Sequence, residues 1–228
     1  MVLKISHTQI SYINNPKPIL DVDFAEFGSS INFLVGKNGS GKSTLLRALS
    51  SHNDEVVVKG NIELEGKPLQ NFDIGLVAQI PQKSVNLELT FIENLLLAKT
   101  NGIEHISLGT QTNKSNIEIV LKFLKGFKNW DFLSELCYKE TADLSSGQQQ
   151  LLAILMRVIR FQNLLLLDEC TANLDSENTN IILGILEELV KKGTIVLFAT
   201  HQMELLKTNY SKTFLIENGK IKIQNQNN

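Results

Sequence analysis

Residues 36–44 read GKNGSGKST, and this glycine-rich stretch decides the fold of the chain. It follows the apolar run INFLV at residues 31–35 and leads into a helical pattern that contains Leu45, Leu46 and Leu49. A strand, a glycine-rich turn and a helix in this order form a phosphate cradle, because backbone N–H groups and the positive end of the helix dipole face the same anion. The sequence therefore predicts a P-loop, which many unrelated nucleotide-binding proteins share.

The cradle assigns a role to each residue of its second half. Lys42 is expected to neutralise the β- and γ-phosphates, and the Ser43 hydroxyl to ligate Mg²⁺. The alternative is a glycine-rich turn with an incidental lysine, but all the fixed positions of the motif are matched in a strand–helix context. The predicted phosphate-binding residues are Asn38, Gly39, Ser40, Gly41, Lys42, Ser43 and Thr44.

A Mg²⁺ site needs a second anchor, and the adjacent carboxylates Asp168 and Glu169 supply one. They follow the four leucines at residues 164–167, which predict a buried strand of the parallel type. Parallel strands end at the crevice in which ligands of such sheets bind, and a buried charge is costly without a partner. We therefore interpret Asp168 as a metal ligand and Glu169 as the general base that polarises the attacking water.

The overall composition disfavours several other classes of protein. With 22 basic and 24 acidic residues among 228, the charge balance does not favour nucleic acid or an anionic bilayer as the main partner. Two cysteines, Cys137 and Cys170, are too few for a disulfide framework and lack metal-ligand spacing, which favours a reducing compartment. The N-terminus lacks the apolar centre of a signal peptide. No segment approaches the roughly 18 apolar residues of a spanning helix, so another chain is expected to supply any membrane spans.

The pattern of elements predicts an α/β core with a helical insert. Residues 1–82 read as strands with one helix, and residues 83–140 read mainly as helices. From residue 141 to 228, buried strands alternate with helices, which predicts a mainly parallel sheet covered on both faces. We expect a single domain over residues 1–228, in which the first and last parts form the nucleotide-binding core and residues 83–140 form a helical subdomain.

Several local signals refine this pattern. Gly60-Asn61 is expected to form a turn and Asn218-Gly219 a hairpin. Thr90 and Glu93 have the spacing of a capping box that opens a helix, and a polar loop is expected from about residue 100 to 115. The tail QNQNN at residues 224–228 is expected to be disordered.

The stretch LSSGQ at residues 144–148 lies directly before a long helical pattern. A segment of small residues that opens a helix is a second anion site, with backbone amides and the Ser145 hydroxyl able to hold phosphate. The alternative is a simple N-cap. Because the stretch lies between the cradle and the leucine strand, we favour the anion site.

Taken in order, these motifs resemble those of the nucleotide-binding subunit of an ATP-binding cassette (ABC) transporter. Each motif alone is weak, but six in the family's order, spread over nearly the whole chain, are specific. The resemblance implies a P-loop NTPase core with a mainly parallel sheet, an antiparallel β subdomain and an inserted helical subdomain. The motifs are Walker A at residues 36–43, a Q-loop glutamine at Gln79, a variant signature at 144–148, Walker B at 164–169, a D-loop ending in Asp175 and a switch histidine at His201.

The resemblance also implies roles for single residues. Gln79 is expected to contact Mg²⁺ or the water, although Gln82 lies in the same segment. Tyr12 either stacks on adenine or packs on its own sheet. The implied catalytic residues are Glu169, His201 and Gln79, and the implied metal ligands are Ser43, Gln79 and Asp168. Ser145, Gly147, Gln148, Asp175 and Tyr12 join the cradle as nucleotide-binding residues.

ATP and Mg²⁺ are the implied ligands, and a second cassette is the implied partner. In the family, two subunits pair head to tail, so that the cradle of one and the signature of the other enclose each ATP. A two-fold dimer of one chain provides this arrangement at both sites. A separate integral-membrane permease is implied, with a substrate-binding protein in importers, and no nucleic acid. The chain would then lie in the cytoplasm, peripheral to the inner face of the cell membrane.

Three positions depart from the family pattern. Ser146 replaces a glycine, which costs roughly 1 kcal/mol or more if the backbone there is left-handed. Leu151 replaces an arginine, and Cys170 replaces a proline in a way that favours importers of small organic solutes. The alternatives are an exporter ATPase and a soluble ABC ATPase such as an iron-sulfur assembly factor. A P-loop GTPase is disfavoured, because the string NKSN at residues 113–116 lacks the guanine-reading aspartate.

Overall fold

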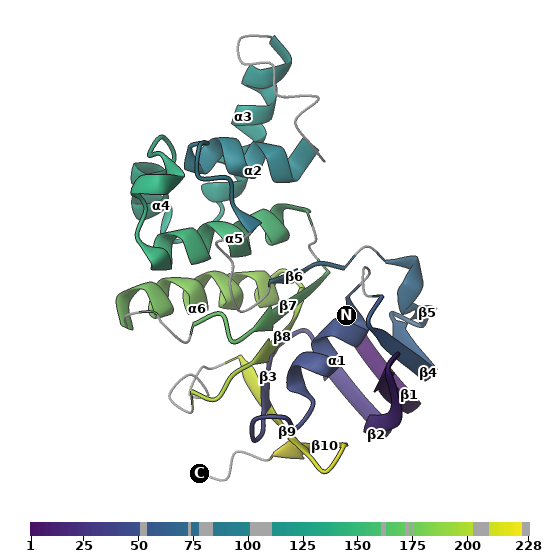
Figure 1. Ribbon diagram of the computed structural model, residues 1–228. Coiled ribbons are helices and arrows are strands. Elements are labelled where there is room, and N and C mark those ends of the chain that lie inside the picture. The colour runs from purple at the N-terminus through teal and green to yellow at the C-terminus, as the bar shows by residue number, and fades with distance from the viewer. Residues whose placement is uncertain are drawn as a thin grey trace. The chain divides into compact units, whose positions relative to one another are not determined.

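A computed structural model provides the structure, and residues with uncertain placement are left undescribed. The described residues are 1–50, 54–72, 74–77, 84–100, 111–160, 163–171, 174, 176–202 and 210–224. Contacts divide the chain into two units (Figure 1). The first comprises residues 1–79, 163–172 and 189–228, and the second comprises residues 80–162 and 173–188. The second unit is defined by contacts and is larger than residues 83–140. The boundaries predicted for the helical subdomain stay a prediction.

The first unit contains a six-stranded sheet with the order β10-β9-β3-β8-β7-β6. The pairs from β9 to β6 are parallel, and only the edge pair β9–β10 is antiparallel, which confirms the predicted mainly parallel sheet. Every residue of β3, β7 and β8 is buried, as expected for strands that are apolar except for Asn32 in β3 and Asp168 in β7. The bounds are β3 Ile31–Val35, β6 Leu76–Val77, β7 Leu164–Asp168, β8 Ile195–Ala199, β9 Ser211–Glu217 and β10 Lys220–Gln224.

The hairpin predicted at Asn218-Gly219 is confirmed. Glu217 pairs with Lys220, so two residues connect β9 to β10. Both connecting residues have positive φ, 50° at Asn218 and 76° at Gly219, which is the requirement of the tight turn that suits the twist of paired strands.

A second, antiparallel sheet lies in the same unit with the order β2-β1-β4-β5. The prediction of a turn at Gly60-Asn61 is wrong, because β4 runs through both residues. Gly60 instead faces an irregularity in β1, and a Cβ atom at Gly60 would lie 2.4 Å from the backbone oxygen of His7. The glycine permits a close approach of two strands. The bounds are β1 Val2–Tyr12, β2 Asn15–Gly28, β4 Val56–Leu64 and β5 Lys67–Pro68, followed by the 3₁₀ helix η1 Leu69–Asn71.

Helix α1, Lys42–Leu49, packs into the core that joins the two sheets (Figure 1). Leu45, Leu46 and Leu49 are almost completely buried there, together with side chains of both sheets such as Phe27 and Phe214. The helix contains the three leucines of the predicted helical pattern and ends at the last of them, Leu49. This core holds the start of α1 against the carboxyl end of β3.

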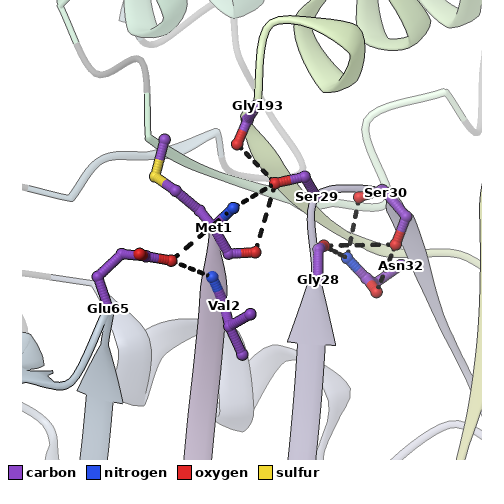
Figure 2. A network of polar contacts seen from close by, with 8 residues as sticks. All are labelled: Met1, Val2, Gly28, Ser29, Ser30, Asn32, Glu65 and Gly193. Atoms are coloured by element: carbon purple, nitrogen blue, oxygen red, sulfur yellow. Dashed lines mark hydrogen bonds and ion pairs between the residues drawn. The ribbon is translucent and has the colours of Figure 1, made fainter.

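The turn between β2 and β3 fastens the antiparallel sheet to the parallel one (Figure 2). The Met1 amino group donates to Ser29 Oγ at 2.9 Å, and Ser29 Oγ donates to the Gly193 carbonyl at 2.8 Å. The fully buried Asn32 side chain donates to the carbonyl of Val196 in β8 at 3.0 Å. Buried polar groups are stabilising only when they are paired in this way, so the turn fixes where β3 enters the parallel sheet.

The second unit is helical. The predicted capping box is confirmed, because the Thr90 N–H donates to Glu93 Oε2 at 2.8 Å and the Glu93 N–H donates to Thr90 Oγ1 at 3.4 Å. The predicted loop to residue 115 is too long, since α3 already begins at Gln111. The helices are α2 Phe91–Thr100, α3 Gln111–Leu124, α4 Trp130–Leu136, η4 Thr141–Asp143, α5 Ser146–Arg160 and α6 Ser176–Lys191, whose last residues belong to the first unit.

Across the described part of the chain, the helices are too short or too polar for a membrane span. The predicted disorder of the tail is wrong for Gln224, which ends β10, and residues 225–228 lie outside the described residues.

Candidate nucleotide-binding site

The loop between β3 and α1 depends on glycines at its two ends. A Cβ atom at Gly36 would lie 2.4 Å from the backbone oxygen of Ile216 in β9. A Cβ atom at Gly41 would lie 2.8 Å from the Leu20 side chain, and Gly41 has a φ of 107°. Gly41 is the N-cap of α1 and offers no capping side chain, so the first amides of the helix are suited to an anion.

Lys42 lies inside this loop. Its ammonium group donates to the carbonyls of Gly36 at 2.8 Å and Lys37 at 3.2 Å, and the residue is only 5% exposed. The Ser40 hydroxyl is buried nearby with no hydrogen-bond partner among the described residues. A buried hydroxyl without a partner is uncommon in folded proteins, and it fits a loop whose remaining partner is a phosphate.

Ser43 meets Asp168 across the end of the parallel sheet. Its Oγ donates to Asp168 Oδ1 at 3.0 Å, and Asp168 is 9% exposed. Burial raises the pKa of the Asp168 carboxyl, the Ser43 hydrogen bond lowers it, and the neighbouring Glu169 charge raises it further. Hydroxyl and carboxylate oxygens are ligands that Mg²⁺ prefers, and the charges of Lys42 and Arg47, which lower the pKa of Asp168, do not offset the effect of its burial. The two residues thus fit a Mg²⁺ ion.

The raised pKa of Asp168 predicts that Asp168→Asn stabilises the nucleotide-free protein at neutral pH. Folding favours the protonated carboxyl, so the contribution of Asp168 to stability is present below its ordinary pKa of 3.8 and is lost as the pH rises through the raised value. We expect Asp168→Asn to raise the Tm at pH 7 by a few degrees, since about 1 kcal/mol shifts the Tm of a chain of this size by about 2–4 °C.

Calorimetry with and without the substitution, from acidic to neutral pH, measures this effect. The two melting temperatures should converge as the medium becomes acidic enough to protonate Asp168. Asp54→Asn, at an exposed position, is the matched control and should leave the Tm unchanged. A lower Tm for Asp168→Asn at pH 7 would contradict the account in which burial of the Asp168 charge costs more stability than its neighbouring charges and hydrogen bond restore.

Glu169 and His201 come together at the ends of two neighbouring parallel strands. Asp168 pairs with Ala199, and the Glu169 N–H donates to the Ala199 carbonyl at 2.9 Å. The Glu169 carboxylate, 19% exposed, lies 3.5 Å from His201 Nδ1, while the His201 side chain is 56% exposed. Glu169 has a φ of 49°, a left-handed conformation that is uncommon outside glycine. The structure therefore brings together an acid–base pair from segments far apart in the sequence.

Tyr12 ends β1 beside the start of α1. Its hydroxyl lies 3.3 Å from the Thr44 hydroxyl, a contact that sequence reasoning did not anticipate. It leaves open both earlier alternatives for the Tyr12 ring, because a tyrosine has an apolar face as well as a polar tip.

A cavity of about 890 Å³ borders the loop. Sequence motifs pointed to its loop residues and to His201, but they missed the residues contributed by β2 and by the β9–β10 hairpin, which carry no recognisable motif. Its size lies within the range of small-molecule sites. The residues missed are Asn15, Lys17, Pro18, Ile19, Asp21, Leu215, Ile216, Glu217, Asn218, Gly219 and Gln224.

In the second unit, Ser145 caps helix α5. The Gln148 N–H donates to Ser145 Oγ at 3.2 Å, and the Ser145 N–H donates to Gln148 Oε1 at 3.1 Å. This reciprocal pair is a capping box, so the N-cap alternative for this stretch is realised here. The phosphate contacts of Ser145, Gly147 and Gln148 stay a prediction.

The departures in and after the signature have structural counterparts. Ser146 is the first residue of α5 and lies outside the positive-φ residues, so the cost of a left-handed serine does not arise. Leu151 is buried in α5, as an apolar residue allows. A Cβ atom at Gly147 would lie 2.8 Å from the Asn178 amide of α6, so this glycine permits the close approach of two helices. Cys170, next to Glu169, is buried.

Three predicted residues cannot be placed. Gln79, its alternative Gln82, and Asp175 lie outside the described residues, so their roles stay predictions.

Comparison with known sequences finds a matching family model and relatives that are all named as ATP-binding proteins. The family model described as "ABC transporter" matches residues 21–172. A phosphate import ATP-binding protein of Borrelia garinii subsp. bavariensis is 31% identical over 218 residues, with 89% of this chain and 79% of that protein covered. A cell division ATP-binding protein of Streptococcus pneumoniae is 26% identical, with 92% and 89% covered. An ABC transporter ATP-binding protein of Clostridium perfringens is 29% identical over 96% of this chain, which spans only 37% of its length.

Solved structures share the fold. An ATP-binding cassette of an ABC transporter in its ADP conformation matches with a TM-score of 0.76 at 23% identity, covering 97% of this chain and 89% of that one. A dimeric post-hydrolysis state of an ATP-binding cassette bound to ADP and Pi matches with a TM-score of 0.71 at 20% identity, covering 99% of each chain. These likenesses confirm the predicted α/β fold with a P-loop NTPase core.

Proposed function

This chain belongs to the ABC transporter family as an ATP-hydrolysing, nucleotide-binding subunit, and from that premise we propose that two cassettes close head to tail on ATP and drive a separate membrane permease. The partner cassette is a second copy of this chain or a related subunit. The complex lies at the inner face of the cell membrane, with the permease supplying the membrane spans.

The observation that carries the proposal is the cluster at the end of the parallel sheet. Ser43 Oγ lies 3.0 Å from Asp168 Oδ1, and the Glu169 carboxylate lies 3.5 Å from His201. Phosphoryl transfer needs phosphate positioning, charge neutralisation and an oriented water rather than covalent chemistry from the protein. A buried lysine within the P-loop, Lys42, completes these requirements.

Each residue of the cluster has a proposed task. Ser43 and Asp168 would hold Mg²⁺, which neutralises phosphate charge when it is bound. When nucleotide binds, the Lys42 ammonium group donates its hydrogen bonds to the β- and γ-phosphates instead of to the loop carbonyls. Glu169 accepts a proton from the attacking water. His201 holds the Glu169 carboxylate in position relative to the terminal phosphate. Gln79 and Asp175 are proposed to join the site from the family pattern alone.

The signature is proposed to close the site of the partner cassette. The capping box of Ser145 and Gln148 sets the first turn of α5, and the start of a helix carries partial positive charge that favours phosphate. Because both anion sites lie on one chain, a two-fold pair can complete two composite sites with a single surface.

We propose that the permease imports a small solute and works with a substrate-binding protein. Support comes from a relative named for phosphate import and from Cys170 in place of the family proline. Another relative is named for cell division rather than for import, so the test must distinguish an importer from an exporter and from a soluble ATPase. Purification of the chain from membranes together with a bound integral-membrane protein, whose cargo is then assayed in vesicles, decides between them.

Disulfide crosslinking tests the head-to-tail arrangement. In a chain carrying Ser40→Cys and Ser145→Cys, we expect disulfide-linked dimers only when ATP is present, because the P-loop of one chain then faces the signature of the other. Each single-cysteine variant is the matched control, and the native Cys137 and Cys170 are both buried. Gel electrophoresis without reductant gives the readout. Crosslinks that form equally without ATP, or within one chain, contradict the arrangement.

The companion variant Ser145→Arg separates closure from binding. It should leave nucleotide binding by the single chain unchanged, but prevent the ATP-dependent dimer, because a bulky charge at the interface meets no partner. Light scattering in ATP measures the dimer.

A further inference from the structure

A second contact joins the segments that carry Glu169 and His201. The Thr171 hydroxyl donates to Gln202 Oε1 at 2.9 Å, and Gln202 Nε2 donates to the Thr171 carbonyl at 3.4 Å. The single carboxamide of Gln202 therefore holds both the side chain and the backbone of Thr171. Thr171 is 1% exposed, and Gln202 is half-buried.

Gln202 is also held from its own side. Its backbone N–H donates to Thr200 Oγ1 at 3.0 Å. The Thr200 N–H donates in turn to the carbonyl of Leu34 in β3 at 3.2 Å, and Thr200 is 2% exposed. His201 thus lies between two anchored neighbours, although its own side chain is mostly exposed.

Glu169 depends on the same contacts from the other side. Its left-handed backbone, with a φ of 49°, is strained for a residue with a side chain, and such strain persists only where the surroundings hold it. The Ala199 carbonyl fixes Glu169 at the end of the sheet. The Thr171–Gln202 contact fixes the chain two residues later, so that the turn carrying Glu169 is held at both ends.

We propose that Gln202 is a positioning residue for the Glu169–His201 pair and that it acts through Thr171. The inference rests on the proposed role of Glu169 in ATP hydrolysis. Among the described residues, the partners of Gln202 are Thr171 and Thr200 rather than residues of the P-loop. The contact therefore sets the geometry of the water-activating side of the site and leaves nucleotide binding to the P-loop.

A double-mutant cycle on the full chain tests the inference. Thr171→Val removes the hydroxyl at nearly constant volume, and Gln202→Leu removes the carboxamide. We expect each single variant to lower kcat about tenfold, with the KM for ATP changed by less than about twofold, because misplaced catalytic groups cost rate rather than ground-state binding. The double variant should be no worse than Gln202→Leu alone, because that substitution already removes the contact with the Thr171 hydroxyl.

Two further variants distinguish positioning from general destabilisation. Thr171→Ser keeps the hydroxyl and should retain kcat within about twofold of the unsubstituted chain, since the same donor remains. Gln70→Leu changes an exposed glutamine of η1 and is the matched control, with unchanged kcat. ATP affinity by calorimetry, measured on every variant, confirms that the nucleotide site is folded.

Each outcome bears on one proposal. An unchanged kcat in Gln202→Leu and Thr171→Val, or losses that multiply in the double variant, would overturn the positioning role while the ATPase assignment stands. A loss of ATP affinity that matches the loss of rate would also overturn it, because the contact would then serve the whole fold. An unsubstituted chain that binds and turns over no ATP would overturn the proposed function, and the positioning role with it.

Discussion

Replacing Glu169 with glutamine should lower the rate of ATP hydrolysis by about 10²- to 10⁴-fold and leave ATP binding intact. Glutamine keeps the volume of the side chain that lies 3.5 Å from His201, but it cannot accept the proton of the attacking water. Because hydrolysis is proposed to end the closed state, the variant should accumulate an ATP-bound dimer. This effect is among the largest expected from any single substitution in the chain.

Phosphate release measures the rate, and light scattering at saturating ATP measures the dimer. Glu88→Gln, at an exposed position before α2, is the matched control and should hydrolyse ATP like the unsubstituted chain. If Glu169→Gln stays monomeric at saturating ATP and turns over normally, Glu169 is not the base.

Replacing Lys42 with alanine should abolish tight ATP binding. The substitution removes the cation proposed to meet the phosphates, and a hydrogen bond to a charged group is worth about 1.5–3 kcal/mol, or roughly 10- to 150-fold in affinity. It also removes the two contacts by which the ammonium group holds the Gly36 and Lys37 carbonyls. The loop should then lose part of its shape along with its charge.

Titration calorimetry with ATP and Mg²⁺ gives the affinity. Lys212→Ala removes an exposed lysine of β9 and is the matched control for the loss of one positive charge. An affinity of Lys42→Ala equal to that of the control would refute the phosphate cradle assigned to residues 36–44.

Elements with one strong periodic or apolar signal were predictable from the sequence. The buried strands β3, β7 and β8 are almost entirely apolar, and α4 lies within the stretch 83–140 predicted to be mainly helical. Gly60 shows where such reasoning fails. A glycine followed by asparagine signals a turn, but the same residue is needed where two strands approach closely, and only the partner strand distinguishes the two cases.

The site was predictable where a residue belongs to a recognisable motif. Lys42, Ser43 and Asp168 lie together as their motifs imply. The Tyr12–Thr44 and Thr171–Gln202 contacts were not predictable, because no motif in the sequence pairs these side chains. Hydroxyls and carboxamides of this kind occur throughout the chain, and no local pattern says which of them will meet after folding.

The left-handed backbone of Glu169 has a consequence for how this sequence changes over generations. Glycine and asparagine adopt a φ of 49° more readily than glutamate, so random substitution to either would relieve strain while removing the carboxylate. A laboratory library sorted only for heat resistance should therefore enrich inactive descendants at this position, as stability and activity select opposite residues there. A lineage in which residue 169 remains glutamate is one in which ATP turnover is still under selection.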